Sequence, residues 1–420
     1  MTAGRPDVAI VGAGLSGLAC ALRLHEAGAP FLVLEASDGV GGRVRTDAVD
    51  GFRLDRGFQV LLTAYPESRR VLDYAALDLR AFEPGALVWK AGRFRTLSDP
   101  WRRPGKAWAS LNSGIGSLRD KVRLARLRAE VQRGPLEAVF RRPETSTHER
   151  LHGAGFSSDM IETFLRPLFA GILLDPDLRA SSRMFDFVFR MLAQGDAVVP
   201  AAGMGAIPEQ MAARLPKGSI RLGARVASVG SGKVRLASGE VVEARAVVIA
   251  VEGPEAARLT GRLTDPGSRP VTCLYFAAEG PAPVSEPVLM LDGERRGPVN
   301  NLCFPSQIEP ACAPPGATLV SASVLEGSGL APGAVEDATR AQLETWFGPA
   351  VRSWRHLRTY HIPHAQPEQL PPALDTHGRP VRLAPGLFVC GDHRDIASIH
   401  GAMVSGRRAA DALLAAERGA

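Results

Sequence analysis

The chain has 420 residues, 45% hydrophobic and 22% charged, a globular composition that excludes a disordered or collagen-like chain. This length exceeds what one hydrophobic core organises, so we expect two domains or one domain with a large insertion. The formal net charge of +6 favours anionic ligands, but the basic residues are dispersed and no DNA- or RNA-reading motif is present, so we expect no nucleic-acid partner.

The lengths of the apolar runs and the spacing of the cysteines indicate the cellular compartment in which we expect the protein. No run of about 18 apolar residues occurs and no signal peptide is recognised, which predicts a cytoplasmic protein. The five cysteines are widely spread and form no CxxC pair. We therefore expect reduced thiols and no metal site.

A strand, a glycine-rich turn and a helix are predicted at the N-terminus. The apolar run 7–11 leads into GAGLSG at 12–17, and helical spacing follows. In such a turn Gly12 provides the backbone angles, Gly14 lets a pyrophosphate approach the main chain, and Gly17 lets the helix pack close to the strand. The helix N-terminus would face the phosphates with its N–H groups.

An acidic residue ends the next predicted strand. Gly28 caps the first helix, residues 31–35 (FLVLE) form the strand, and Glu35 stands 18 residues beyond Gly17. A carboxylate there can accept both ribose hydroxyls and disfavours a 2′-phosphate. The fingerprint does not distinguish between NAD and FAD as the bound cofactor. Arg43, after two glycines, could pair with the pyrophosphate.

The order GxGxxG, Glu, GGR resembles the flavin-containing amine oxidase superfamily, which includes monoamine oxidases, protoporphyrinogen oxidases and phytoene-desaturase-type carotenoid enzymes. The resemblance recurs at residues 54–59 (LDRGFQ), similar to a segment near the flavin ring, and at 199–208 (VPAAGMGAIP), similar to a loop near the active site. Residues 386–392 (GLFVCGD) match the second FAD signature, and 397–402 (ASIHGA) open the last helix.

This resemblance implies non-covalently bound FAD. Asp392 would contact its ribityl and phosphate part, the strand at Val226 would touch adenine, and the helix start at 398–399 would lie near the pyrimidine edge of the flavin. The implied FAD contacts are Gly12, Gly14, Leu15, Ser16, Gly17, Glu35, Ala36, Gly42, Arg43, Gly57, Phe58, Val226, Gly391, Asp392, Ser398 and Ile399.

The fingerprints at both ends must meet at one ligand, so the expected fold is α/β. It consists of a Rossmann-type FAD-binding domain assembled from discontinuous segments and a mixed α+β substrate domain. The FAD-binding segments are 1–75, 217–262 and 375–420, and the substrate segments are 76–216, mainly helical, and 263–374, sheet-rich. Residues 219–251 read as a β-meander, and 271–278 and 317–325 as strands.

A basic helix is predicted near residues 117–133. Its apolar side carries Leu118, Val122, Ala125 and Ala129. One interpretation is a solvated surface helix packed on the domain. The other is peripheral docking on an anionic membrane, with Trp101 and Trp108 at the interface.

The expected chemistry is that of the flavin, which the protein binds and orients. Amine-oxidising relatives usually flank the flavin with two aromatic residues and a lysine. Here Phe388 is the only Phe, Tyr or Trp between residues 370 and 406, and no lysine follows Lys233. Residues 164–175 resemble the RPFxxGVFLD segment of carotenoid desaturases. This apolar segment could line a tunnel for a long hydrophobic substrate, or it could be a core helix followed by a turn. Of the histidines near the flavin end, His400 is the catalytic candidate.

We therefore predict an FAD-dependent oxidoreductase that oxidises an isoprenoid-, carotenoid- or porphyrinogen-like hydrophobic molecule by hydride transfer to the flavin. Oxygen or a quinone would be the electron acceptor. The alternatives are an amine or amino-acid oxidase with an atypical aromatic cage, and a flavoprotein without net oxidase activity.

Overall fold

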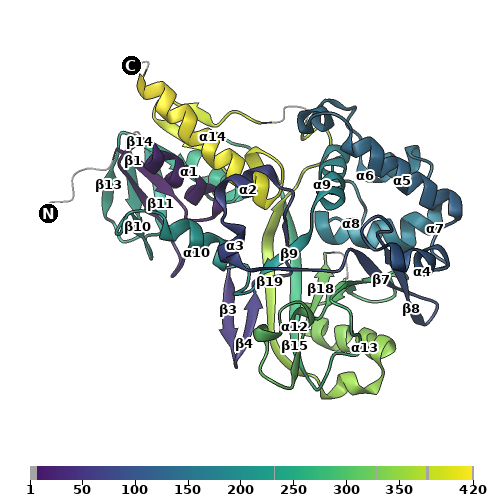
Figure 1. Cartoon of the computed structure of the whole chain (residues 1–420). Helices are drawn as coiled ribbons and strands as arrows, with labels where there is room; N and C mark the ends of the chain where they lie inside the picture. Colours follow the sequence, from purple (N-terminus) through teal and green to yellow (C-terminus); the bar gives the residue numbers. More distant parts are fainter. Residues whose placement is uncertain (1–6, 231, 327–328, 375–377, 419–420) are drawn as a thin grey trace.

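A six-stranded sheet gathers strands from both ends of the chain (Figure 1). The computed structural model describes residues 7–230, 232–326, 329–374 and 378–418. In spatial order the strands are β10 (Ile220–Arg221), β2 (Phe31–Leu34), β1 (Val8–Val11), β14 (Ala246–Ile249), β21 (Leu387–Val389) and β20 (Arg382–Ala384). All neighbouring pairs are parallel except β20 with β21. The predicted Rossmann-type α/β fold is therefore confirmed.

Helices from the two ends of the chain pack against each other beside this sheet. These are α1 (Leu15–Glu26) and α14 (Ile399–Arg418), which lie together in Figure 1. A Cβ at Gly406 would stand 2.1 Å from the carbonyl oxygen of Ser16. Only glycine allows the two helix backbones to approach so closely.

The predicted β-meander is shorter than expected. It comprises β11 (Val226–Gly230), β12 (Lys233–Leu236) and β13 (Val241–Glu243), which pair in antiparallel order. The flanking residues 220–221 and 246–249 join the six-stranded sheet instead. The run AVVI at 246–249 is buried along its whole length, as is typical of a central parallel strand rather than an outer meander strand.

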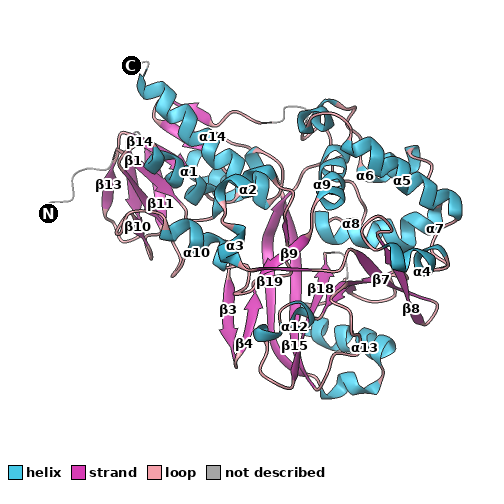
Figure 2. Cartoon of the chain, viewed as in Figure 1, coloured by secondary structure: helices cyan, strands magenta, loops and turns pink. Residues whose placement is uncertain are grey.

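A second sheet, of seven strands, forms the core of the other half of the molecule. Figure 2 shows that helices lie beside it. In spatial order its strands are β19 (Arg355–Pro367), β15 (Ser268–Glu279), β18 (Ala317–Leu325), β17 (Val299–Cys303), β16 (Leu289–Asp292), β7 (Gly85–Lys90) and β8 (Arg93–Ser98). The strands predicted at 271–278 and 317–325 are confirmed. β7 and β8 come from the stretch predicted to be mainly helical, so residues on both sides of the meander share this sheet.

The stretch from residue 107 to residue 194 is mainly helical. Its helices are α4 (Ala107–Leu111), α5 (Leu118–Gln132), α6 (Thr147–Gly153), α7 (Ser158–Met160), the π-helical turn η3 (Ile161–Leu165), α8 (Arg166–Leu173) and α9 (Ser182–Gln194). Capping boxes of Ser117 with Asp120 and of Ser146 with Glu149 begin α5 and α6. None of the helices in the described part of the chain is long and apolar enough to cross a bilayer.

The face of α5 that packs on the protein is not the apolar face that its sequence periodicity predicts. The helix is buried through Leu127 and Val131, whereas Leu118 and Val122 are exposed. The apolar side predicted from spacing therefore points to solvent, and a second apolar stripe packs on the protein.

The remaining strands and α-helices lie outside these groups. They are β3 (Thr46–Val49), β4 (Phe52–Asp55), β5 (Leu61–Leu62), α2 (Pro66–Val71), α3 (Tyr74–Leu77), β6 (Leu79–Ala81), β9 (Ala197–Pro200), α10 (Ala206–Ala213), α11 (Gly253–Thr260), α12 (Pro305–Ile308) and α13 (Val335–Phe347). β3 pairs with β4, and β9 lies between β5 and β6.

Candidate active site

A cavity of about 680 Å³ extends from the N-terminal glycine turn to α8, α9 and the seven-stranded sheet. Fifteen of the sixteen residues predicted to contact FAD line it, although they come from all three of the separate segments predicted to bind FAD. The exception is Gly17. The structure thus brings the predicted binding residues to one place.

The three fingerprint glycines have different surroundings. Gly12 has a φ of +103°, and a Cβ on it would lie 2.7 Å from the carbonyl oxygen of Ala250. A Cβ on Gly17 would lie 2.0 Å from the carbonyl oxygen of Gly12, so Gly17 serves the packing of α1 on β1. A Cβ on Gly14 would meet no protein atom within 4 Å and would stand at the cavity wall. The turn therefore leaves room for a ligand at Gly14, as a bound pyrophosphate requires.

Glu35 is held at the carboxyl end of β2, next to this turn. Its Oε2 accepts a hydrogen bond from the N–H of Ala13 at 2.7 Å. Its Oε1 accepts from the N–H and the hydroxyl of Ser37, at 2.9 and 2.8 Å. Each carboxylate oxygen has two lone pairs, so Oε2 retains one for a ribose hydroxyl, whereas both lone pairs of Oε1 are used.

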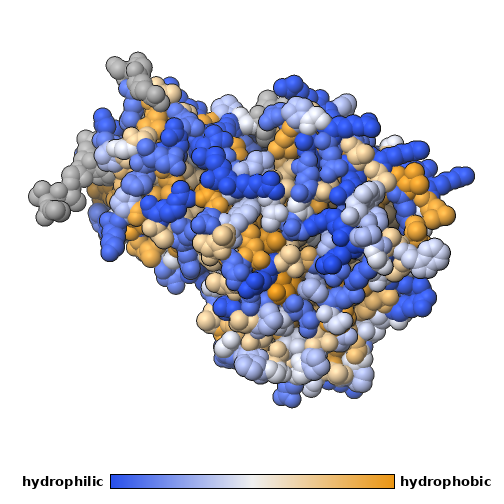
Figure 3. Space-filling view, in the orientation of Figure 1, coloured by the Kyte–Doolittle hydropathy of each residue, from blue (hydrophilic) through white to orange (hydrophobic). Residues whose placement is uncertain are grey.

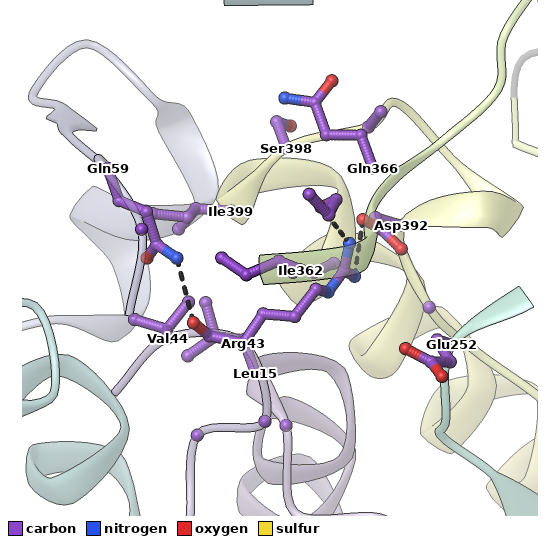
Figure 4. Close-up of a pocket in the computed structure, with 18 of the residues that line it drawn as sticks. Leu15, Arg43, Val44, Gln59, Glu252, Ile362, Gln366, Asp392, Ser398 and Ile399 are labelled. Carbon is purple, nitrogen blue, oxygen red and sulfur yellow. Dashed lines mark hydrogen bonds and ion pairs between the residues drawn. The ribbon is translucent and has the colours of Figure 1, made fainter. Parts of the chain in front are cut away.

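The second glycine turn packs directly on the first. The N–H of Gly41 donates to the carbonyl of Ala13 at 2.8 Å. Arg43 then reaches across the cavity wall, donating to Asp392 Oδ2 at 2.7 Å and to the carbonyl of Ala365 at 2.6 Å (Figure 4). One guanidinium thus joins the N-terminal stretch to β19 and to the C-terminal signature.

The segment after β4 contributes Gly57, Phe58 and Gln59 to the wall. The side-chain amide of Gln59 donates to the carbonyl oxygens of Arg43 at 2.9 Å and Arg56 at 3.3 Å (Figure 4). Its Oε1 is buried and accepts no hydrogen bond from the described residues. Sequence reasoning found no chemistry in this segment and missed this acceptor.

The loop 199–208 lies behind that segment. No residue of the loop is among the described residues that line the cavity. Instead, the N–H of Met204 donates to Asp55 Oδ1 at 2.9 Å, and Thr46 Oγ1 donates to the same oxygen at 2.5 Å. Burial raises the pKa of Asp55 to about 6 in spite of these hydrogen bonds.

The start of α14 reaches the cavity through Ser398, Ile399 and Ala402. The positive end of a 20-residue helix therefore faces the cavity. The ring of His400 turns away from the cavity and stacks on Tyr65 and Phe187, with ring centroids 5.7 and 5.5 Å apart.

His400 also accepts a hydrogen bond at Nδ1 from the N–H of Glu67, at 3.3 Å. The residue that reaches the cavity from this aromatic stack is Tyr65. Burial raises the pKa of the Tyr65 phenol, so the phenol stays protonated. His400 is therefore not a wall residue itself but packs behind Tyr65, which is one.

The other histidines near the flavin end lie off the cavity wall. His361 pairs with Thr272 at 3.1 Å, and His364 pairs with Ser268 at 2.8 Å. His393 is buried, which lowers its pKa to about 4. Within the described ranges, no group of three or more His, Cys, Asp or Glu side chains is arranged to hold a metal ion.

The end of the cavity beyond the residues predicted to bind the dinucleotide is largely apolar. Its apolar lining comprises Val60, Leu62, Pro167, Leu168, Ile172, Leu174, Met184, Val188, Leu192, Val271, Leu289 and Leu291. Polar groups come from Tyr65, Asn301, Ser323 and Gln366. The charged side chains among the described lining residues are Glu35, Arg43, Arg225, Glu252, Glu255 and Asp392, all from the segments predicted to bind FAD. This end therefore presents no charge to a substrate.

The segment 164–175 has both of the roles considered for it. Leu168 and Ile172 line the cavity, whereas Phe169 and Leu173 are buried in the core. A Cβ on Gly171 would lie 2.8 Å from Asn301 Oδ1, so this glycine lets α8 lie directly on the sheet.

Some lining residues were not anticipated from sequence. Ile362 and Gln366 come from β19, which reaches the cavity only because it pairs with the distant β15. Glu252 follows β14, the parallel neighbour of β1. Polar residues at carboxyl ends of adjacent parallel strands converge, so the position of Glu252 after an apolar run was a usable signal.

Comparison with known proteins agrees with this geometry. A family model described as flavin containing amine oxidoreductase matches residues 15–414. Polyamine oxidase 1 of Oryza sativa subsp. japonica is 28% identical over 264 residues, 56% of this chain and 49% of that protein. Coproporphyrinogen III oxidase of Propionibacterium freudenreichii subsp. freudenreichii is 28% identical over 120 residues, 27% and 23% of the two chains. The chain thus spans about half or less of these relatives.

Solved structures share the fold along nearly the whole chain. Cyclohexylamine oxidase from Brevibacterium oxydans IH-35A superposes with a TM-score of 0.73 at 17% identity, covering 99% of this chain and 100% of that one. Reduced UDP-galactopyranose mutase superposes with a TM-score of 0.71 at 16% identity, covering 98% and 96%. At these identities the likeness concerns the fold alone.

Proposed function

The chain belongs to the family of flavin containing amine oxidoreductases and is an FAD-dependent oxidoreductase, and we propose that it oxidises a hydrophobic small molecule of isoprenoid, carotenoid or porphyrinogen type. Oxygen or a quinone would accept the electrons afterwards. We place this desaturase- or oxidase-type reaction in the cytoplasm.

One observation carries the proposal: the substrate end of the cavity has an apolar wall without a charged side chain. Moving a cation into such a site without a partner costs several kcal/mol. An apolar molecule instead gains about 25 cal/mol for each Å² of surface that it buries. The wall therefore favours neutral, apolar substrates over polyamines.

The residues on the wall have distinct tasks. Bound FAD supplies hydride and electron transfer. Glu35 and the turn at Gly14 would hold the ribose and pyrophosphate. The pair of Arg43 and Asp392 fixes the wall between the two fingerprints. Gln59 offers a fixed acceptor, because its amide nitrogen is already engaged by two main-chain carbonyls.

A second candidate is an amine oxidase with an atypical aromatic cage. Two aromatic side chains, Phe58 and Tyr65, reach the cavity, and the relatives include a polyamine oxidase. A neutral amine could be accommodated between such rings. A flavoprotein without net oxidase activity would need the same cofactor contacts.

The deciding experiment is anaerobic reduction of the FAD in the purified holoenzyme, followed by its visible absorbance. The panel contains neutral isoprenoids, a carotene and a porphyrinogen, with polyamines and cyclic amines as the opposing class. We expect one of the hydrophobic compounds of the first group to bleach the flavin and to yield one oxidised product for each FAD. Bleaching by amines alone would establish the second candidate, and conversion without oxidised product would establish the third.

A variant tests the wall itself. Leu168→Asp places a carboxylate at the apolar end and should lower kcat/KM for the apolar substrate at least tenfold while FAD content stays at the wild-type level. Val241→Asp, at an exposed position on β13 that is not among the described lining residues, is the control. Equal kcat/KM for the two variants would show that the substrate does not contact α8.

A further inference from the structure

Exposed apolar side chains are concentrated in one region of the surface. Five of the seven large apolar residues that the structure describes as exposed lie between residues 101 and 122. They are Trp101, Trp108, Leu111, Leu118 and Val122, which we call the apolar patch. Trp108 is 76% exposed and Leu118 67%. Soluble proteins seldom gather such side chains without a partner.

Two contacts join the segment that carries Trp101 and Leu111 to α5, the helix that carries Leu118 and Val122. Lys121 on α5 donates from Nζ to the carbonyl of Leu111, the last residue of α4, at 2.8 Å. The guanidinium of Arg128, also on α5, lies 5.0 Å from the ring centroid of Trp101. Figure 3 shows hydrophobic atoms next to strongly hydrophilic ones at the right-hand edge, where Figure 1 places α5.

The same face of α5 carries positive charge. At 100° per residue, Arg119 and Arg126 share the outward arc with Leu118 and Val122, opposite the buried Leu127. Both arginines are exposed and form no ion pair with a described residue. Between residues 99 and 133 the sequence has nine Lys and Arg and three Asp and Glu, so this segment alone accounts for the net +6 of the chain.

We propose that the apolar patch, with Arg119 and Arg126 beside it, docks the protein on the surface of an anionic lipid bilayer. The tryptophans and aliphatic side chains would enter the interfacial region, and the guanidinium groups would lie at the level of the lipid phosphates. This docking does not depend on which substrate the enzyme oxidises.

Charge favours lipid over a second copy of the chain. A two-fold dimer formed through this patch would bring Arg119 and Arg126 of one copy near those of the other, which like-charge repulsion opposes. An anionic bilayer provides both an apolar interior and the opposite charge. Nucleic acid would match the charge but leave the central apolar residues without a partner.

Docking here would place the substrate cavity close to lipid. Arg128 and Gln132 of α5 donate to the carbonyl of Ala193 at 2.8 and 3.4 Å, at the end of α9. Met184 and Val188 on α9 line the cavity. One helix thus separates the proposed lipid surface from the cavity wall.

The test is flotation of the holoenzyme with vesicles of phosphatidylcholine, with and without phosphatidylglycerol, at low and high salt. The charge variant is Arg119→Gln with Arg126→Gln, and its control is Arg235→Gln with Arg382→Gln, two exposed arginines on the FAD-binding side. The apolar variant is Trp108→Ser, with Leu222→Ser as its control. FAD content and the melting temperature verify that each variant is folded.

We expect binding to the anionic vesicles that weakens with salt. Each charge removed near an anionic surface should weaken partitioning roughly fivefold, so the charge variant should bind about thirtyfold more weakly and its control unchanged. Trp108→Ser should weaken binding roughly tenfold or more. Brominated lipid should quench the protein's fluorescence, and Trp108→Ser should reduce that quenching to the part that Trp101 contributes.

Three results would overturn the proposal. One is no binding to anionic vesicles at low salt by the folded holoenzyme. Another is binding that the patch variants and the control variants alter equally. The third is self-association that the patch variants abolish, measured by sedimentation, which would make this face an interface between copies of the chain.

Discussion

Replacing Gly14 tests the cofactor site without disturbing the fold. Gly14 has φ −70° and ψ 176°, which any residue adopts, and a Cβ there meets no protein atom within 4 Å. Gly14→Val should therefore fold with an unfolding free energy within about 1 kcal/mol of wild type, because a side chain also restricts the unfolded chain. Its isopropyl group would stand in the cavity, where the pyrophosphate must approach.

The expected loss of FAD affinity follows from the contacts that the side chain displaces. A hydrogen bond to a charged group is worth about 1.5–3 kcal/mol. Losing two of them at the phosphates costs about 3–6 kcal/mol, or roughly 10²- to 10⁴-fold in Kd. The measurement is a fluorescence titration of the apoprotein with FAD, next to chemical denaturation of the same sample.

Two other glycines make the result interpretable. Gly17→Ala should lower stability severely, because its Cβ would lie 2.0 Å from the carbonyl oxygen of Gly12. Gly153→Val is the control, since that glycine is exposed and a Cβ on it also meets nothing within 4 Å. If folded Gly14→Val binds FAD as tightly as wild type, the pyrophosphate does not lie at this turn and the reasoning is refuted.

Three further variants probe the wall and its support. Arg43→Ala leaves Asp392 without its 2.7 Å ion pair and should cost the apoprotein about 1–3 kcal/mol in denaturant unfolding; an unchanged midpoint would contradict this. Asp55 has its pKa raised to about 6, so wild-type stability should fall as pH rises from about 4 through 6. The Asp55→Asn variant should not lose stability over this pH range, and at pH 8 its unfolding free energy should exceed that of wild type by up to ~3 kcal/mol. Identical dependence of the unfolding free energy on pH in the two proteins would contradict this prediction. His400→Phe keeps the stack but leaves the N–H of Glu67 without that acceptor; we expect a loss of about 1–3 kcal/mol in stability with unchanged FAD content and kcat within twofold, whereas a hundredfold loss in kcat would show a catalytic role.

Local features of the site could be predicted from sequence. The roles of Gly12, Gly14 and Gly17 depend on a turn, a strand and a helix that are consecutive in the chain, and the structure gives each glycine the predicted surroundings. The position of Glu35 follows from the same unit, because β1 and β2 are parallel neighbours.

Features that depend on distant pairing could not be predicted in this way. Gln366 reaches the cavity because β19 pairs with β15 across about 90 residues of sequence. Periodicity identified an apolar face on α5, but burial shows that Leu127 and not Leu118 meets the protein. His400 is next to the lining residue Ile399 in sequence, yet its ring faces the aromatic stack.

The assembly of the six-stranded sheet has a consequence for biosynthesis. β1 needs β14 on one side, β14 needs β21, and α1 packs on α14. A ribosome therefore releases the first strand of this sheet hundreds of residues before its last partner. Until then, strand edges stay open to pairing with other chains, which exposes the nascent chain to aggregation. The wall of the cavity is complete only when Asp392 and Ile399 have been synthesised. A cofactor bound there would therefore act late, as a ligand that stabilises a sheet closed after translation.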